Sequence, residues 1–181
     1  MLKSAKPYRT VVFDLETTGL SPFRGDRIIE IGAIIVEGGS IVREYHSLID
    51  AGRPVSIHAF KVNGINREML AHAPKPETVM PEFKDFISDS VLVAHNAKFD
   101  IGFLRYEFSR QGIAFSNRHH CTLTDARRLY PKLQNHRLET VYRHLFGALP
   151  DKVNMHRALD DARMTARVWM EIEAFKSSTP C

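Results

Sequence analysis

The sequence predicts an α/β fold in which helices flank a mixed β-sheet. Three early segments are rich in β-branched and aromatic residues, and the hairpin-type turn Glu37-Gly38-Gly39-Ser40 joins the second segment to the third. Stretches whose apolar residues recur at helical spacing follow, and one short apolar run among them is expected to form a further strand. A meander of strands followed by alternating strands and helices is typical of a sheet with antiparallel and parallel neighbours.

The early strands are expected at residues 8–13, 27–36 and 41–49, where Val, Ile, Phe and Tyr favour extended backbone. Pro and Gly within 21–27 predict a loop between the first two strands. The stretch 50–76 contains three prolines, and a short helix is possible at 67–70.

Helices dominate the remainder of the chain. Thr78 is expected to cap a helix that carries Pro81 in its first turn. A short strand is expected at 90–94, followed by helices at 99–110, 122–130 and 137–146. The last helix is expected at 157–175, with an inner stripe of Ala162, Thr165, Trp169 and Ile172.

The length and composition indicate one globular domain. At 181 residues the chain has the size of a single domain, and we expect one domain over 1–181 with a core at about 8–175 and a short tail at 176–181. Apolar residues make up 44% of the chain and charged residues 25%, which excludes a disordered or collagen-like protein.

Neither a membrane segment nor a secretion signal is recognisable. No apolar run approaches the roughly 18 residues of a membrane span, and Asp14 interrupts the first apolar stretch, so a signal-peptide core is lacking. Cys121 and Cys181 are too few for a disulfide framework or a four-cysteine zinc site. We therefore expect a cytoplasmic protein with no membrane partner.

Charge is distributed unevenly along the chain. The whole chain has a net charge of +4, with −1 over residues 1–104 and +5 over 105–181. A basic excess of this size is compatible with a polyanionic partner such as nucleic acid, and equally with a solvated basic face.

A pair of acids follows the first predicted strand. Asp14 and Glu16 are two residues apart, so an extended backbone points both side chains to one face at the carboxyl end of the strand. Adjacent carboxylates repel each other, and a hard divalent cation removes that conflict. The alternative is that one carboxylate is exposed and the other caps a turn.

Two further motifs carry acids at the starts of helices. Asp100 follows the short strand and its loop residues His95 and Asn96, although the helix dipole alone would favour an acid there. His156 and Asp161 are five residues apart and converge only if His156 lies on the loop before the last helix. An imidazole beside a carboxylate suits a general base, but these residues could also simply start the helix.

The three motifs together favour a metal site. They supply four carboxylates and one histidine, and no cluster of soft ligands competes with them. His119-His120-Cys121 is too compact for a metal trio and is interpreted as structural. Oxygen ligands suit Mg²⁺ or Mn²⁺, and four carboxylates fit a pair of such ions, the arrangement used for in-line phosphoryl displacement.

These motifs resemble those of the DEDDh 3′–5′ exonucleases, a family with an RNase H-like fold. Residues 13–19, 95–100 and 156–162 look like the family's three motifs in their correct order, and the resemblance covers residues 8 to about 170. Residues 101–108 are similar to the proofreading epsilon subunits of bacterial DNA polymerase III. The resemblance implies an exonuclease domain with a possible proofreading role and a possible polymerase partner.

The resemblance also implies roles for individual residues. Asp14, Glu16, Asp100 and Asp161 would hold two divalent cations, Mg²⁺ or Mn²⁺, and His156 would deprotonate the attacking water. The implied reaction is metal-dependent hydrolysis at the 3′ end of DNA, expected to be single-stranded, with release of nucleoside 5′-monophosphates.

Substrate contacts are implied for Thr17 and Thr18 in the first motif, and for His58 and Asn63. The chain departs from the family at Asn63, where histidine is common, and at Asp160, an extra acid. The family spacing favours Asp161 over Asp160 as the ligand.

Other functions remain open at the level of the sequence. The motifs do not reveal contacts to a 2′-hydroxyl, so an RNA-trimming exoribonuclease is an alternative. A non-catalytic, polymerase-associated nucleic-acid binding module is another, although the intact set of acids and His156 argues against it. A relative of this fold acting on a different phosphoester is a weaker third.

Overall fold

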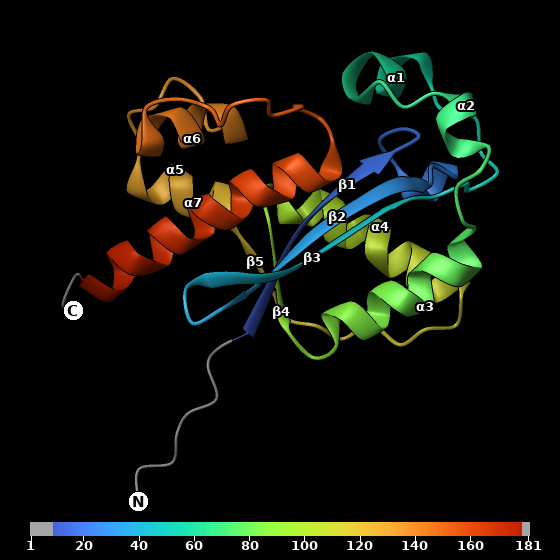
Figure 1. Ribbon diagram of the computed structural model, residues 1–181, viewed down its shortest axis with the longest axis horizontal. Coiled ribbons are helices and arrows are strands. Elements are labelled where there is room, and N and C mark those ends of the chain that lie inside the picture. The colour runs from blue at the N-terminus through green and yellow to red at the C-terminus, as the bar shows by residue number, and fades with distance from the viewer. Residues whose placement is uncertain (1–8, 179–181) are drawn as a thin grey trace, which may run out of the picture.

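A five-stranded mixed sheet with helices on both faces forms the centre of the computed structural model, which describes residues 9–178 (Figure 1). The strands are β1 (Arg9–Thr17), β2 (Ile28–Glu37), β3 (Ser40–Leu48), β4 (Val91–Ala94) and β5 (His119–Cys121), in the order β3-β2-β1-β4-β5. β1, β2 and β3 are antiparallel neighbours, whereas β4 is parallel to β1 and β5 to β4. The predicted mixed sheet is confirmed.

Within the described residues, eight helical segments connect and cover the strands. They are η1 (Pro22–Arg24), α1 (Ile57–Asn63), α2 (Arg67–Leu70), α3 (Pro76–Ile87), α4 (Ala97–Arg110), α5 (Thr122–Leu129), α6 (Leu138–Phe146) and α7 (Ala158–Ser178). Figure 1 shows α3 and α4 on one side of the sheet, and α7 with α5 and α6 on the other. None of the helices in the described part combines the length and apolar character that a membrane span requires.

The alternation of side chains in β1 assigns its two faces. Val11, Phe13 and Leu15 pack in a core with α3 and α4. Val12 points the other way and packs against the stripe of α7 that contains Ala162. Since side chains alternate along a strand, Asp14 and Glu16 lie on the same face as Val12, which is the face covered by α7.

Most predicted elements are confirmed within a few residues. The β2–β3 turn has Gly38 and Gly39 at positive φ of 57° and 77°, the conformation that two-residue hairpin turns require. The stripe of α7 that contains Trp169 is buried as expected. α7 extends to Ser178, three residues into the segment that was expected to be a tail.

The predicted start of α3 is wrong. The helix begins at Pro76 with Lys75 as its N-cap, and Thr78 lies inside it. A proline in the first helical position has a suitable φ and lacks only an N–H that would be unpaired there, so Pro76 starts the helix without a capping side chain. Pro81 therefore falls in the second turn.

Two elements escaped the sequence analysis. α1 is a short helix capped by Ser56, whose Oγ accepts a hydrogen bond from the Ala59 N–H, and it ends at Gly64 with φ 66°. It buries little apolar surface, so it has no strong periodic pattern. β5 has only three residues and lies at the sheet edge, in a stretch for which the sequence predicted no strand.

Gly32 in β2 lies directly beneath the first turn of α7. A Cβ at this position would lie 2.2 Å from the Ala158 carbonyl carbon and the Leu159 backbone nitrogen. Gly32 is opposite Asp14 in the β1–β2 register. Only a glycine lets the start of α7, which carries Asp161, approach the sheet so closely.

We expect Gly32→Ala to destabilise the protein by about 1–3 kcal/mol, because the helix backbone has to move away from the sheet. Gly102→Ala is the matched control. Gly102 lies in α4, where an added Cβ would meet no atom within 4 Å, and alanine there is expected to stabilise the helix by about 0.5–1 kcal/mol. Urea denaturation measures both, and equal effects of the two substitutions would contradict the close approach.

Candidate active site

Four acidic side chains converge from three separate parts of the chain. Asp14 and Glu16 come from β1, Asp100 from the first turn of α4 and Asp161 from the first turn of α7. Asp100 and Asp161 are buried, at 3% and 6% exposed. Burial raises the pKa of Asp14, and the nearby charges of Asp100, Asp161 and Glu16 raise it further.

His156 lies beside this cluster on the loop before α7. Ligand atoms of Glu16, His156 and Asp161 all lie within 4.8 Å of one another. The backbone N–H of His156 donates to Asp161 Oδ2 at 3.1 Å. His156 has a positive φ of 61°, and its side chain is exposed. The five-residue spacing therefore brings the two side chains together through a loop, as the sequence analysis required.

Burial and mutual repulsion disfavour the charged forms of these acids. Burial raises the pKa of Glu16 to about 8, although a hydrogen bond from Asn63 opposes the shift. Burial raises the pKa of Asp161 to about 6. The pKa values of Asp14 and Asp100 are also raised, mainly by burial. The polypeptide alone does not stabilise four negative charges at this position.

The cluster fits a divalent cation. Asp161 Oδ1 is buried and has no hydrogen-bond partner among the described residues. Leaving a buried acceptor unpaired costs free energy, so its partner is expected to come from outside the chain. Carboxylate oxygens are the donors that hard cations such as Mg²⁺ and Mn²⁺ prefer.

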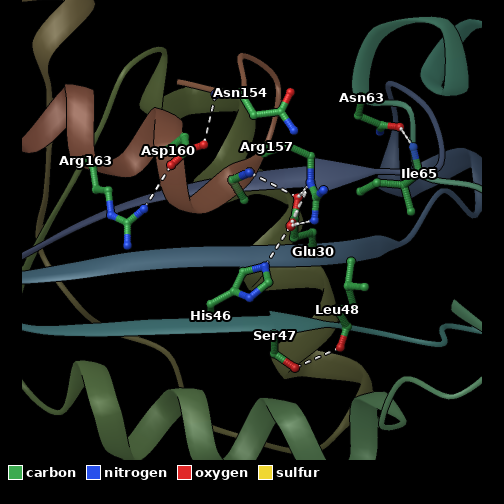
Figure 2. A network of polar contacts seen from close by, with 11 residues as sticks. Glu30, His46, Ser47, Leu48, Asn63, Ile65, Asn154, Arg157, Asp160 and Arg163 are labelled. Carbon is green, nitrogen blue, oxygen red and sulfur yellow. Dashed lines mark hydrogen bonds and ion pairs between the residues drawn. The ribbon is translucent and has the colours of Figure 1, made fainter. Parts of the chain in front are cut away.

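Asp160, the extra acid, forms its hydrogen bonds outside the acidic cluster. Its Oδ2 accepts from the Asn154 N–H at 3.0 Å, and its Oδ1 accepts from Arg163 at 2.9 Å (Figure 2). It therefore supports the loop before α7 and is not one of the three residues that form the possible metal cluster.

Glu30 in β2 is a functional candidate that the sequence analysis missed. Its carboxylate is 1% exposed and accepts hydrogen bonds from the Arg157 side chain, the Ala158 N–H and His46 Nε2, at distances down to 2.6 Å (Figure 2). Burial alone would raise the pKa of Glu30, but these donors outweigh it and hold the pKa at about 2. A glutamate inside the aliphatic run of β2, and an arginine next to His156, are the signals that could have revealed this pair.

Glu30 fastens the loop that carries His156. Arg157 follows His156 directly, and its guanidinium is held on β2 by Glu30. Glu30 is opposite Glu16 in the β1–β2 register, so the anchor lies beside the acidic cluster. The start of α7 is therefore fixed to β2 by both the Glu30 carboxylate and the contact with Gly32.

We expect Glu30→Gln to destabilise the protein by roughly 3–5 kcal/mol, because it leaves the partly buried Arg157 without its counter-charge. Glu44→Gln is the matched control, since Glu44 also pairs with an arginine, Arg163, but at an exposed position. Its expected cost is at most about 1 kcal/mol. Thermal or urea unfolding measures both, and similar losses would contradict the anchoring role.

Thr17 and Thr18, which were predicted to contact substrate, form hydrogen bonds within the protein. Thr18 is fully buried, and its Oγ1 accepts from the Arg27 N–H at 3.0 Å. Thr17 Oγ1 donates to the Gly19 carbonyl at 2.6 Å. These hydroxyls shape the turn after β1, and the exposed side chain of this turn is Leu20. Direct contact of Thr17 and Thr18 with substrate stays a prediction.

Asn63 and His58 belong to α1. Asn63 is 6% exposed, its Oδ1 accepts from the Ile65 N–H, and it also hydrogen-bonds Glu16. It therefore orients an acid of the cluster. His58 is exposed, and the Ser56 N–H donates to the Thr18 carbonyl at 3.0 Å, which ties the start of α1 to the turn after β1.

A cleft of about 610 Å³ opens beside the acids. Asp14, Asp161 and His156 line one part of it, together with Met155. The remainder is lined by residues of α5, α6 and the loop between them, and by His95 and Asn96. His95 joins this wall to β4: its Nδ1 lies 2.9 Å from Thr122 Oγ1, and its Nε2 lies 2.8 Å from the His136 carbonyl. Burial lowers the pKa of His95, although the hydrogen bond to the His136 carbonyl opposes the shift.

Comparison with known proteins places the chain in a family. A family model described as "Exonuclease" matches residues 11–169. The chain is 45% identical over 161 residues to the PolC-type DNA polymerase III of Thermotoga maritima, and 38% identical over 164 residues to that of Bacillus subtilis. These matches cover 88% and 90% of the chain but 11% of each polymerase, so the chain spans about a tenth of the length of these relatives.

Solved structures show the same fold. Exonuclease X in complex with 5′-overhanging duplex DNA superposes with a TM-score of 0.73 at 29% identity, covering 94% of both chains. Escherichia coli exonuclease I in complex with a dT13 oligonucleotide gives a TM-score of 0.81 at 17% identity over 94% of this chain and 42% of that one, a likeness of fold alone. The predicted RNase H-like fold is confirmed. The chain belongs to the exonuclease family, in agreement with its resemblance to the DEDDh 3′–5′ exonucleases.

Proposed function

We propose that this chain is a metal-dependent 3′–5′ exonuclease that removes nucleoside 5′-monophosphates from single-stranded 3′ ends of DNA. The observation that carries the proposal is the meeting of four acids and His156 at one end of a cleft. The raised pKa values of Glu16 and Asp161 and the unpaired Asp161 oxygen fit a site for hard cations.

In this proposal, Asp14, Glu16, Asp100 and Asp161 hold two divalent ions, Mg²⁺ or Mn²⁺. When bound, such ions stabilise the charge that develops on the phosphoryl oxygens during in-line displacement. His156 accepts a proton from the attacking water at an imidazole nitrogen. Glu30 and Arg157 keep the loop of His156 in place, and Asn63 orients Glu16.

The relatives support a DNA substrate and a role close to replication. Exonucleases X and I, the structural neighbours, are bound to DNA in the structures described above. The polymerases that share this domain suggest that the chain acts with a DNA polymerase in the cytoplasm and proofreads its product. The basic excess of residues 105–181 supports a polyanionic partner.

The decisive experiment is a cleavage assay on single strands. The protein is incubated with 5′-labelled DNA or RNA oligonucleotides of equal sequence, with Mg²⁺, Mn²⁺ or EDTA. We expect a ladder that shortens from the 3′ end of DNA and is abolished by EDTA. Faster shortening of RNA would favour the exoribonuclease, and binding without any metal-dependent product would favour a non-catalytic module.

Metal binding should also change the thermal stability of the protein. Because burial raises the native pKa values of Glu16 and Asp161 above their ordinary values, the native state binds extra protons, and the stability of the metal-free protein falls as pH rises from about 4 to about 8. Cations bind the deprotonated form, so the Tm increase given by Mn²⁺ should be larger at pH 8 than at pH 5.5. Differential scanning fluorimetry tests this, and a larger increase at pH 5.5 would contradict it.

A further inference from the structure

The wall of the cleft opposite the acids carries two arginines. Arg127 of α5 and Arg137, the residue before α6, line the cleft and are exposed. Within residues 9–178, neither guanidinium has a hydrogen bond or an ion pair. Other arginines around the site differ: Arg27 is held by Glu107, and Arg157 by Glu30.

The position of this wall is fixed with respect to the acids. His95 follows β4, the neighbour of β1, and its ring connects Thr122 of α5 to the His136 carbonyl. Arg137 follows His136, and Arg127 is one helical turn and a half beyond Thr122. His95 thus links the backbone segments that carry the two arginines to the end of β4, which neighbours the strand of Asp14 and Glu16.

A nucleic acid strand that left the acids along this wall would need positive charge there. The proposed cations would neutralise the phosphate at the bond being cut, but the phosphates 5′ to it would extend beyond the acids. The acids themselves repel these phosphates, and Glu139 adds another negative charge to the cleft. Guanidinium groups bind phosphate oxygens through paired, charge-assisted hydrogen bonds.

We propose that Arg127 and Arg137 bind the phosphates 5′ to the scissile bond, so that the strand leaves the acids along the wall formed by α5 and the segment before α6. The inference rests on the proposed exonuclease function and adds the path of its substrate. Leu123, Leu138 and Met155 in the same cleft offer apolar surface to sugars and bases. Contacts of this kind read the backbone and not the sequence of bases.

The test compares two substrates with Arg127→Gln, Arg137→Gln and the double variant. One substrate is a labelled oligothymidylate, and the other is the p-nitrophenyl ester of thymidine 5′-monophosphate, which has a single phosphate and nothing 5′ to it. Arg118→Gln is the matched control, because Arg118 is exposed and lines a different cavity before β5. Exposed guanidiniums without partners can be removed without unfolding the protein, and thermal unfolding verifies this.

We expect each single variant to lose about threefold to tenfold in kcat/KM on the oligonucleotide, chiefly through KM. The ratio of kcat/KM on the oligonucleotide to kcat/KM on the ester should fall by a similar factor in each single variant. It should fall further in the double variant. The slope of log(kcat/KM) against log salt should become shallower by about 0.7 for each arginine. Arg118→Gln should change none of these values.

Equal losses on both substrates would overturn the inference, since the arginines would then act at the reacting phosphate. An unchanged ratio with no loss on either substrate would overturn it as well. If the unmodified protein cleaves neither substrate, the proposed function fails. The inference is then decided by fluorescence anisotropy of oligothymidylate binding: weaker binding by the double variant supports the path, and unchanged binding overturns it.

Discussion

We expect Asp161→Asn to lower kcat at least about a thousandfold, because the proposed site would lose a cation ligand that contributes roughly 4 kcal/mol to the stabilisation of the transition state. Asparagine has nearly the same shape, and its side-chain oxygen still accepts from the His156 N–H, so the loop before α7 keeps its contact. The carboxylate charge is lost. A single-turnover assay with saturating Mn²⁺ measures the effect.

The neighbouring acid provides the matched control. Asp160→Asn removes one exposed pairing with Arg163 and keeps an acceptor for the Asn154 N–H, so its kcat should stay within about threefold of the unmodified protein. Asp161→Asn should also raise the Tm in EDTA at pH 8, because it removes a buried carboxylate from a repulsive cluster. An inactive Asp160→Asn with an active Asp161→Asn would show that the assigned register is wrong.

His156→Asn is expected to lower kcat by about 10²–10⁴, the usual contribution of a general base, with a smaller change in KM. Asparagine tolerates the positive φ of 61° at this position better than most residues, so the backbone of the loop is retained. Loss of activity then reports the missing imidazole.

Chemical rescue separates this role from a structural one. Free imidazole can accept the proton that the missing side chain would take, so added imidazole should restore part of the activity of His156→Asn at saturating Mn²⁺. The unmodified protein should gain no activity from the same concentration of imidazole. Failure of imidazole to restore any activity to the variant would contradict the role of His156 as a base.

The sequence predicted the site through residues whose spacing has a direct geometric meaning. Alternation along β1 places Asp14 and Glu16 on one face whatever surrounds them. With a separation of five residues, His156 and Asp161 could converge only if His156 lay on a loop before the helix, and the backbone adopts this arrangement. The mixed sheet was predicted from the hairpin turn and from the later alternation of strands and helices, patterns that also have a direct geometric meaning.

Contacts between residues that are far apart in the chain could not be predicted from the sequence. Glu30 and Arg157 are far apart in the chain, and only the fold brings them together. Thr18 matched a family position, but its burial depends on the turn formed with Asp26 and Arg27. β5 and α1 are short elements fixed by neighbours and caps, so they carry too little periodic signal to be recognised.

The acids of the site come from opposite ends of the chain, with Asp14 in the first strand and Asp161 in the last helix. During synthesis the sheet can be completed by β5 while the residues after 157 are still to come. Such a growing chain lacks Asp161 and the docked loop of His156, so it would be unable to cut nucleic acid near the ribosome. With the proposed site, activity therefore requires that α7 has emerged and packed against β1.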